Sequence, residues 1–279
     1  MNLVMQTFGR VVRPLFGTGI GRLPFVVPAY KWMWRTFGPK GIVETEANGF
    51  KILVDGKDWA VAPSLYFAHT WEKPETELFK NYIKPGMTVV DIGAHVGYFT
   101  LLASKLVGDK GRVISFEPTP ATLDLLSQNL LDNHITNVEL YKNAAADKSS
   151  GAYLYPDRVS PASNSMYGDG DKGIYISAVA LDDVISAKVD FIKMDIEGGE
   201  YWALKGMLDV VERSDNLTMI TEVYPEGLKR SGSSLYEYLM LLKKYFKLYF
   251  TNGAYVGCDD IERAVRKAGS INLLCRRMS

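Results

Sequence analysis

The sequence predicts an α/β fold built on a largely parallel sheet with helices on both faces. Three observations predict it. From residue 88 onward, apolar runs of strand length alternate with segments of helical spacing. These strand runs are apolar along most of their length, as in strands that are buried on both faces. A glycine-containing turn at 93–97 joins the first of them to the helix that follows.

The expected elements follow this alternation in chain order. Strands are predicted at 50–54, 59–62, 88–92, 112–116, 138–141, 189–194, 217–223, 248–250 and 271–275. Helices are predicted at 75–82, 98–107, 122–131, 200–211 and 235–245, the last with its N-cap in the loop 231–234. No full helix is expected between the last two strands, so one of them should run antiparallel.

Composition narrows the class of protein. The chain has 279 residues, a formal net charge of zero and 47% hydrophobic residues, which is ordinary for a globular protein with a full core. Zero net charge gives no general attraction to nucleic acid. Cys258 and Cys275 form no C-x-x-C pair, and three histidines form no metal-ligand cluster, which favours a reducing, cytoplasmic compartment. We find no apolar run of about 18 residues and no convincing signal peptide.

The first 40 residues differ from the rest in charge. They contain six basic residues and no acid, whereas the remaining residues carry a net charge of −6. The segment is also apolar, and Pro24 and Pro28 are expected to break it into short pieces. We therefore divide the chain into a basic, apolar arm at 1–48 and a main domain at 49–279. Two roles stay open for residues 1–40: peripheral association with an anionic membrane surface, or packing on the main domain or on a second copy in a homo-oligomer.

The most specific motif joins the first buried strand to its helix. It reads D-x-G-x-x-x-G, with Asp91, Gly93 and Gly97, and the next strand ends in Glu117 and Pro118. Glycines permit a tight turn and the close approach of a ligand, and an acid after the second strand can accept both ribose hydroxyls. A dinucleotide site uses the same geometry, but G-x-G-x-x-G is absent. The combination favours S-adenosylmethionine over NAD.

Two further strand ends add candidate site residues. The segment 142–147, with Asn143 and Ala144, leaves room for a flat adenine ring, although a plain tight turn explains it equally well. Asp195 and Glu197 follow a buried strand and face the same crevice, where they could orient a substrate, accept a proton or hold a cation. The alternative for these acids is the capping of a helix that starts near residue 199.

Together these segments resemble the FkbM family of methyltransferases. The resemblance runs from 49 to 275 and rests on D-I-G-A-H-V-G at 91–97, F-E-P at 116–118, L-D-D at 181–183 and K-M-D-I-E-G-G-E at 193–200. The stretch 66–77, with Glu72, is also similar. The resemblance implies a class I methyltransferase fold, which is a Rossmann-like sheet of seven strands, and O-methylation, typically of sugar hydroxyls. His95 departs from the family, which usually has asparagine there.

The motifs and the resemblance together predict the site. We expect Asp195 and Glu197 to be catalytic. The residues expected to bind the cofactor are Glu72, Asp91, Gly93, His95, Gly97, Phe99, Glu117, Pro118, Asn143 and Ala144.

Methyl transfer from a sulfonium donor mainly requires that the acceptor be positioned, and a sugar hydroxyl also gains from a general base or a metal. Candidates for the base are Asp195, Glu197, His95, His69 and Glu222, although an ordinary packed histidine is the better interpretation of His69. Asp195 with Glu222 could hold Mg²⁺, and a capping role for Glu222 explains it at least as well.

The acceptor is expected to be a small molecule or a glycan, such as a sugar of a glycolipid. Nucleic acid is disfavoured because the main domain has no basic patch in its sequence. Two alternatives stay open: an NAD-dependent oxidoreductase on a Rossmann-type fold, and a non-catalytic module that binds the cofactor.

Overall fold

The computed structural model describes residues 26–155, 164–167 and 173–278. The elements follow one another as α2 (Val26–Phe37), β1 (Ile42–Ala47), β2 (Phe50–Asp55), α3 (Ala62–Ala68), α4 (Lys73–Tyr82), β3 (Thr88–Ile92), α5 (Tyr98–Val107), β4 (Arg112–Phe116), α6 (Pro120–Asp132), β5 (Val138–Tyr141), β6 (Asn143–Ala145), β7 (Ser150–Leu154), β8 (Ile174–Val179), α7 (Leu181–Val184), β9 (Phe191–Met194), α8 (Glu200–Lys205), α9 (Leu208–Arg213), β10 (Thr218–Val223), α10 (Pro225–Arg230), α11 (Leu235–Tyr245), β11 (Phe246–Phe250), α12 (Cys258–Ala268) and β12 (Ile271–Arg277).

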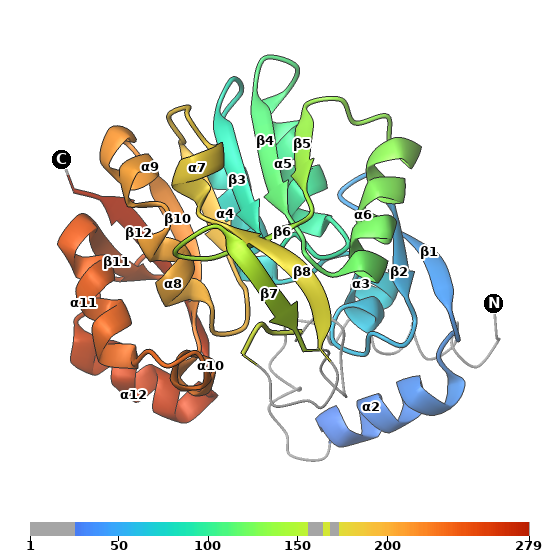
Figure 1. Cartoon of the computed structure of the whole chain (residues 1–279). Helices are drawn as coiled ribbons and strands as arrows, with labels where there is room; N and C mark the ends of the chain where they lie inside the picture. The colour runs from blue at the N-terminus through green and yellow to red at the C-terminus, as the bar shows by residue number, and fades with distance from the viewer. Residues whose placement is uncertain (1–25, 156–163, 168–172, 279) are drawn as a thin grey trace.

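A seven-stranded sheet forms the centre of the molecule, in the order β11-β12-β10-β9-β3-β4-β5 (Figure 1). The five strands β10, β9, β3, β4 and β5 run parallel to one another, whereas β12 runs antiparallel to both β10 and β11. This confirms the predicted fold class and the antiparallel strand near the C-terminal end. The chain crosses from β5 back to β9 on the far side of β3, so the strand order reverses between β3 and β9. Ligands of open α/β sheets bind at such a reversal, beside the carboxyl ends of the strands.

Each face of the sheet carries its own apolar core. Successive side chains of a strand point to opposite faces, so Val90 and Ile92 of β3 belong to one core and Val89 to the other. Residues of α8, α9 and α11, such as Leu204, close the first core, and residues of α3, α4 and α5, such as Phe79, close the second. The two-sided cover explains why the central strands are apolar on both faces.

The β1–β2 hairpin is tied to the domain through α6. Asn129 of α6 accepts a hydrogen bond from the Leu53 N–H at 2.7 Å and donates to the Leu53 and Val96 carbonyl oxygens at 3.0 and 2.8 Å. The predicted boundary between residues 48 and 49 falls in the turn of this hairpin, where Asn48 and Gly49 both have positive φ. The division of the chain into an arm and a domain stays a prediction.

A three-stranded sheet that the sequence did not predict lies next to the main one. Its order is β6-β8-β7, with β6 parallel and β7 antiparallel to β8. One face is buried through small and aliphatic residues, including Ala144, Leu154 and Ile176. Because β6 follows β5 after a single residue, this sheet is attached directly to the edge of the main sheet.

The predicted strand at 59–62 is wrong. Asp58 Oδ1 accepts the N–H groups of Ala60 and Val61, at 3.1 and 3.3 Å, which forms a turn soon after β2. Helix α3 begins at Ala62 with Pro63 in its first turn, where a missing N–H loses no helical hydrogen bond. A short apolar run is compatible with the start of a helix as well as with a strand. Here the turn formed by Asp58 leads directly into a helix.

Two predictions about helices are also wrong. The helix expected at 200–211 is present as two pieces, α8 and α9, separated where Met207 has a non-helical φ of −134°. Gly206 in this break packs so closely on Ala146 that a Cβ would overlap its carbonyl oxygen. A full helix, α12, does separate the last two strands. Of its residues only Ile261 and Val265 are buried, so its apolar stripe is narrow among many charged side chains.

The arm is helical over 26–37, contrary to the expected break at Pro28. This proline lies in the first turn of α2, where a residue without an N–H is tolerated. The rest of the predicted arm, 1–25, lies outside the described residues. No helix in the part of the chain that the structure describes is long and apolar enough to cross a membrane.

Candidate active site

The turns after β3 and β9 lie backbone against backbone. Gly93 has a positive φ of 87°, and a Cβ there would overlap the carbonyl oxygen of Asp195. Gly97 has a φ of 90°, and a Cβ there would overlap the side chain of Leu126 on α6. The first glycine therefore permits the contact of two site-forming turns. The second serves helix packing, and the structure places it outside the pocket described below.

Glu117, which follows β4, is held by two backbone N–H groups. Its Oε2 accepts from His95 at 2.9 Å and its Oε1 accepts from Thr119 at 2.8 Å. The residue is 5% exposed. Each carboxylate oxygen has a second lone pair, so the group can still accept hydrogen bonds from a ligand. The N–H groups of His95 and Thr119 fix the orientation of the carboxylate, and with it the direction of any hydrogen bond to a ligand.

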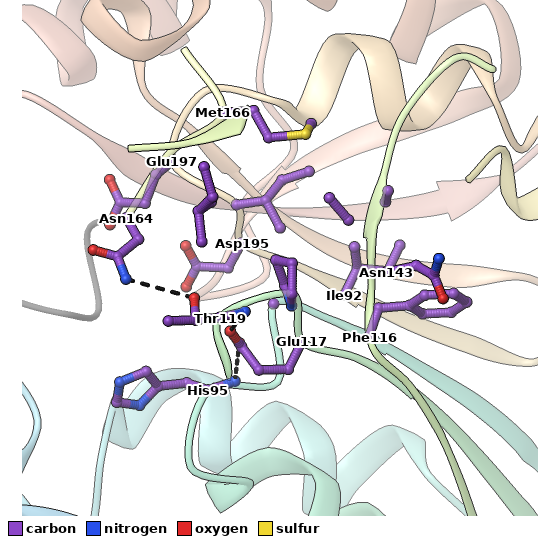
Figure 2. A pocket seen from close by; sticks show the side chains of 16 residues that line it. Ile92, His95, Phe116, Glu117, Thr119, Asn143, Asn164, Met166, Asp195 and Glu197 are labelled. Carbon is purple, nitrogen blue, oxygen red and sulfur yellow. Dashed lines mark hydrogen bonds between the residues drawn. The ribbon is translucent and has the colours of Figure 1, made fainter. Parts of the chain in front are cut away.

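A pocket of about 590 Å³, including its open mouth, lies at the carboxyl ends of β3, β4 and β9 (Figure 2). It is lined by Ile92, Gly93, His95, Phe116, Glu117, Pro118, Thr119, Asn143, Ala144, Ala145, Leu154, Asn164, Met166, Asp195, Ile196 and Glu197.

The structure brings most of the predicted site residues to this pocket. Gly93, His95, Glu117, Pro118, Asn143, Ala144, Asp195 and Glu197 all line it. Glu72, Asp91, Gly97 and Phe99 do not. The segment with Asn143 and Ala144 is strand β6 rather than a plain turn. Beside it, the rings of Phe116 and Tyr141 are stacked with centroids 4.9 Å apart.

The backbone and the side chain of His95 contact two different acidic residues. The backbone N–H donates to Glu117, whereas Nε2 lies 3.1 Å from Asp58 Oδ2. Its φ of 52° is left-handed, which is uncommon for a residue with a side chain. Burial alone would lower the pKa of His95, but the hydrogen bond and negative charge of Asp58 outweigh it, so the pKa is raised. The ring is therefore better suited to holding a proton than to removing one.

Asp91 belongs to a buried polar chain beneath the pocket. Its Oδ2 accepts from the Thr100 hydroxyl at 2.6 Å, and that hydroxyl lies 3.0 Å from Ser115 Oγ. In the sheet Asp91 pairs with Ser115 on one side and with Lys193 on the other. Burial raises the pKa of Asp91, and the charge of Lys193 opposes that rise.

Lys193 is the site residue that the sequence analysis missed. It is 4% exposed, and its Nζ lies 2.9 Å from Asp195 Oδ2, 3.9 Å from Glu72 Oε2 and 4.8 Å from the centre of the Phe99 ring. Burial lowers its pKa, but the charges of Asp195, Glu72 and Asp91 outweigh this, so the pKa is raised. A lysine inside the apolar strand β9 was the available signal, because a buried lysine requires acidic partners.

Glu72 lies behind this lysine with a left-handed φ of 40°. Its Oε2 is buried and has no hydrogen-bond partner. Burial is the main cause that raises the pKa of Glu72 to about 8; Lys193 opposes the rise, and the charge of Asp195 adds to it. At this carboxyl group, burial therefore outweighs the attraction of Lys193.

Glu197 and Glu200 shape the turn after β9. Glu197 has a φ of 56°, and its carbonyl oxygen accepts from the Ser165 hydroxyl at 3.1 Å. Glu200 is fully buried, and its Oε1 accepts the N–H groups of Ile196 and Gly198 at 2.9 and 3.2 Å. Burial raises the pKa of Glu200 to about 7, although those hydrogen bonds oppose it. Glu200 thus holds the turn between β9 and α8, and no side chain caps the N-terminus of α8.

Glu222, at the end of β10, is partly buried close to the same acids. Burial is the first cause that raises its pKa well above the usual range, followed by the charges of Asp195, Glu200 and Glu197; a hydrogen bond with Ser270 opposes them. Its Oε2 has no hydrogen-bond partner. Among the described residues, no group of three or more histidine, cysteine, aspartate or glutamate side chains has an arrangement that could hold a metal ion.

His69 has a structural environment. It is the C-cap of α3 with a left-handed φ of 55°, and its Nδ1 lies 2.7 Å from the Glu46 carbonyl oxygen of β1. These contacts join α3 to the hairpin. His69 is absent from the lining of the pocket.

Several solved structures resemble this one at low sequence identity. An FkbM methyltransferase from Methylobacillus flagellatus KT matches 72% of this chain and 50% of its own, with 18% identity and a TM-score of 0.45. A SAM-dependent methyltransferase from Aquifex aeolicus matches 74% of this chain and 89% of its own, with 19% identity and a TM-score of 0.42. An rRNA methylase from Streptococcus thermophilus matches 74% and 95%, with 14% identity and a TM-score of 0.43.

A curated relative matches over a shorter stretch. The protein-L-isoaspartate O-methyltransferase of Triticum aestivum is 35% identical over 54 residues, which are 19% of this chain and 24% of that protein. The chain thus matches about a quarter of the length of this relative.

The model of the methyltransferase FkbM domain matches residues 91–249, which is more than half of the chain. The match includes both glycine positions of the first turn, Glu117 and the turn after β9 with Asp195. These are the segments that surround the pocket. The chain therefore belongs to the FkbM family of S-adenosylmethionine-dependent methyltransferases.

Proposed function

We propose that this methyltransferase methylates an oxygen atom, and that its acceptor is a hydroxyl of a sugar in a glycan, a glycolipid or a glycosylated metabolite. When bound, S-adenosylmethionine supplies an activated methyl group on a sulfonium centre. The acceptor oxygen forms the new O–C bond as the S–C bond breaks, and the hydroxyl proton passes to a carboxylate. The protein contributes the alignment of the two reactants and a place for the proton.

One wall of the pocket has the properties of a nucleoside site. Glu117 keeps lone pairs toward the pocket while the N–H groups of His95 and Thr119 fix its position. Ala144 and Ala145 leave space beside it, next to the ring of Phe116. We assign the ribose hydroxyls to Glu117 and the adenine ring to the space beside β6.

The facing wall supplies the carboxylates for the acceptor. Asp195 and Glu197 line the same pocket as Glu117, which is the observation that carries the proposal (Figure 2). Lys193 Nζ holds Asp195 by its Oδ2 at 2.9 Å, so the carboxylate has a fixed orientation. A sugar hydroxyl is a weak acid and needs such a hydrogen-bond acceptor in the transition state. We assign Asp195 as the proton acceptor and Glu197 as a group that binds another acceptor hydroxyl.

Ligand-induced stabilisation tests the nucleoside site. S-adenosylhomocysteine should raise the melting temperature, by an amount that grows with the logarithm of its concentration above the dissociation constant, and NAD should not. A shift with NAD alone would overturn the assignment of the pocket and favour an oxidoreductase.

The acceptor side is tested by Asp195→Asn. We expect turnover to fall roughly 10²- to 10⁴-fold, the usual contribution of a general base, with a much smaller change in cofactor affinity. Asp109→Asn is the matched control, because Asp109 is exposed in the turn after α5. The assay uses labelled S-adenosylmethionine with glycans and glycolipids from the source cells, and mass spectrometry locates the methyl group. A methyl group on nitrogen or carbon, or a product without sugar, would overturn the proposal.

A further inference from the structure

We propose that α2 holds this enzyme on an anionic lipid bilayer through an aromatic patch formed by Trp32 and Phe37. This inference is independent of the methylated acceptor, since it concerns a helix that contributes no residue to the pocket. Three observations carry it: the fixed orientation of α2, the exposure of Trp32, and the charge of the arm.

The orientation of α2 is fixed by Trp34. This side chain is 2% exposed, and its Nε1 donates to the Gly56 carbonyl oxygen at 2.8 Å. Its ring meets the edges of Tyr66 and Phe67 of α3, with centroids 5.7 and 5.6 Å apart. One face of α2 is therefore anchored on the domain, and the opposite face has a defined direction.

Trp32 lies on that opposite face. Two residues correspond to a rotation of roughly 200° about a helix axis, so Trp32 points away from the side that Trp34 anchors. It is 63% exposed, although tryptophan is highly buried on average. The ring of Phe37 packs edge-on against it, with centroids 6.0 Å apart. The two rings form one exposed aromatic patch, which we call the α2 patch.

Basic side chains accompany the α2 patch. Arg35 is three residues after Trp32, on the same side of the helix, and is exposed. Lys40 is also exposed, and its Nζ donates to the Arg35 carbonyl oxygen at the end of the helix. The first 40 residues hold six basic residues and no acid. Tryptophan at headgroup depth with cations beside it is the combination that an anionic bilayer surface attracts.

A second copy of the chain fits the α2 patch less well. A stable protein interface buries about 800 Å² on each partner, which is several times the area that two partly exposed rings can supply. A bilayer requires no matching surface, because aromatic side chains insert individually among the headgroups.

Vesicle sedimentation of the full chain tests the inference. We expect the wild-type protein to pellet with phosphatidylcholine vesicles that contain 30% phosphatidylserine at low salt, and to stay in the supernatant with phosphatidylcholine alone or at 0.5 M salt. Trp32→Ala with Phe37→Ala should lower the partition coefficient at least fivefold. The matched control is Tyr236→Ala, an aromatic residue on α11 that is 70% exposed, and it should bind like the wild type.

Two further measurements exclude other reasons for a loss. The double variant must bind S-adenosylhomocysteine like the wild type, which shows that it is folded. If it does not, the single variant Trp32→Ser replaces it in the same assay. Light scattering gives the oligomeric state without vesicles. Wild-type protein that ignores anionic vesicles, variants that bind as well as the wild type, or a wild-type dimer that the double variant dissociates would each overturn the proposal.

Discussion

The two walls of the pocket stabilise their carboxylates differently. On the β4 wall, both oxygens of Glu117 accept backbone N–H groups. At the turn after β9, the partly buried acids Asp195 and Glu72 lie around the buried Lys193. Glu72 and the nearby Glu222 lie outside the lining of the pocket, and each keeps a buried oxygen without a hydrogen-bond partner. A backbone-held carboxylate remains a fixed acceptor, whereas carboxylates that share one cation can exchange protons. The first arrangement suits recognition of a constant cofactor, and the second suits a reaction that releases a proton.

A substitution at the contact between Gly93 and Asp195 should weaken cofactor binding and destabilise the fold together. Gly93→Ala should lower affinity for S-adenosylhomocysteine by roughly a hundredfold or more, because the added Cβ would push the turns after β3 and β9 apart. It should also destabilise the fold by more than the ~1–2 kcal/mol of a left-handed alanine. Gly86→Ala is the matched control, since its φ is 86° and nothing lies within 4 Å of an added Cβ. Calorimetry and thermal melts would contradict this contact if both variants behaved alike.

The β4 wall alone is tested by Glu117. Glu117→Ala should weaken cofactor binding by about 1.5–3 kcal/mol, roughly ten- to hundredfold, with little change in turnover at saturating cofactor. Glu117→Gln should be almost as harmful, because its NH₂ group would face the N–H of either His95 or Thr119. Titration calorimetry gives the affinities. A glutamine variant with wild-type affinity would mean that the backbone does not hold this side chain as described.

A substitution at Glu72, which contacts Lys193 behind the turn after β9, should give the smallest effect and the clearest pH dependence. The pKa of Glu72 is raised from 4.5 to about 8, chiefly by burial. Between these values the folded state binds more protons than the unfolded state, so this residue makes the free energy of unfolding fall as pH rises. Glu72→Gln should remove that contribution, so the variant should gain stability relative to the wild type from pH 5 to pH 8.

Urea unfolding at several pH values measures this trend. Part of the wild-type slope should persist in the variant, since the pKa of Glu200 is also raised, to about 7. Glu77→Gln on the same helix is the control, because that side chain is exposed beside Lys80. A difference between Glu72→Gln and the wild type that does not change with pH would show that Glu72 titrates normally.

The sequence predicted the elements whose signals are local. Buried strands such as β3 and β9 are continuous apolar runs, and Ser234 at the start of α11 accepts the Glu237 N–H as a predicted N-cap does. The small sheet β6-β8-β7 was not predicted because its strands lack a clear alternation of apolar and polar residues. Its outer face carries exposed tyrosines such as Tyr153 and Tyr175. Helix α12 was not predicted because only two of its side chains, Ile261 and Val265, are buried, so its sequence shows little apolar periodicity.

The candidate site divides in the same way. Glu117 and Asp195 could be placed from sequence because each directly follows a strand of a parallel sheet, and such positions converge. The ion pair between Lys193 and Glu72 could not, because it joins a strand to a loop 121 residues earlier in the chain. Neither could the partner of His95, since Asp58 lies in a segment that was assigned to a turn between two strands. Side-chain pairs of this kind depend on how loops fold over the sheet.

The glycine contact between the turns after β3 and β9 has a consequence for divergence within such enzymes. The spacing between the cofactor wall and the acceptor wall is set by main-chain atoms at Gly93 and Asp195, so no side chain has to be re-optimised to preserve it. Side chains that line the pocket, such as Asn164 and Met166, can therefore be replaced without changing how closely these two main-chain segments approach. A single glycine thereby makes the separation of the two turns independent of the side chains that select the ligands.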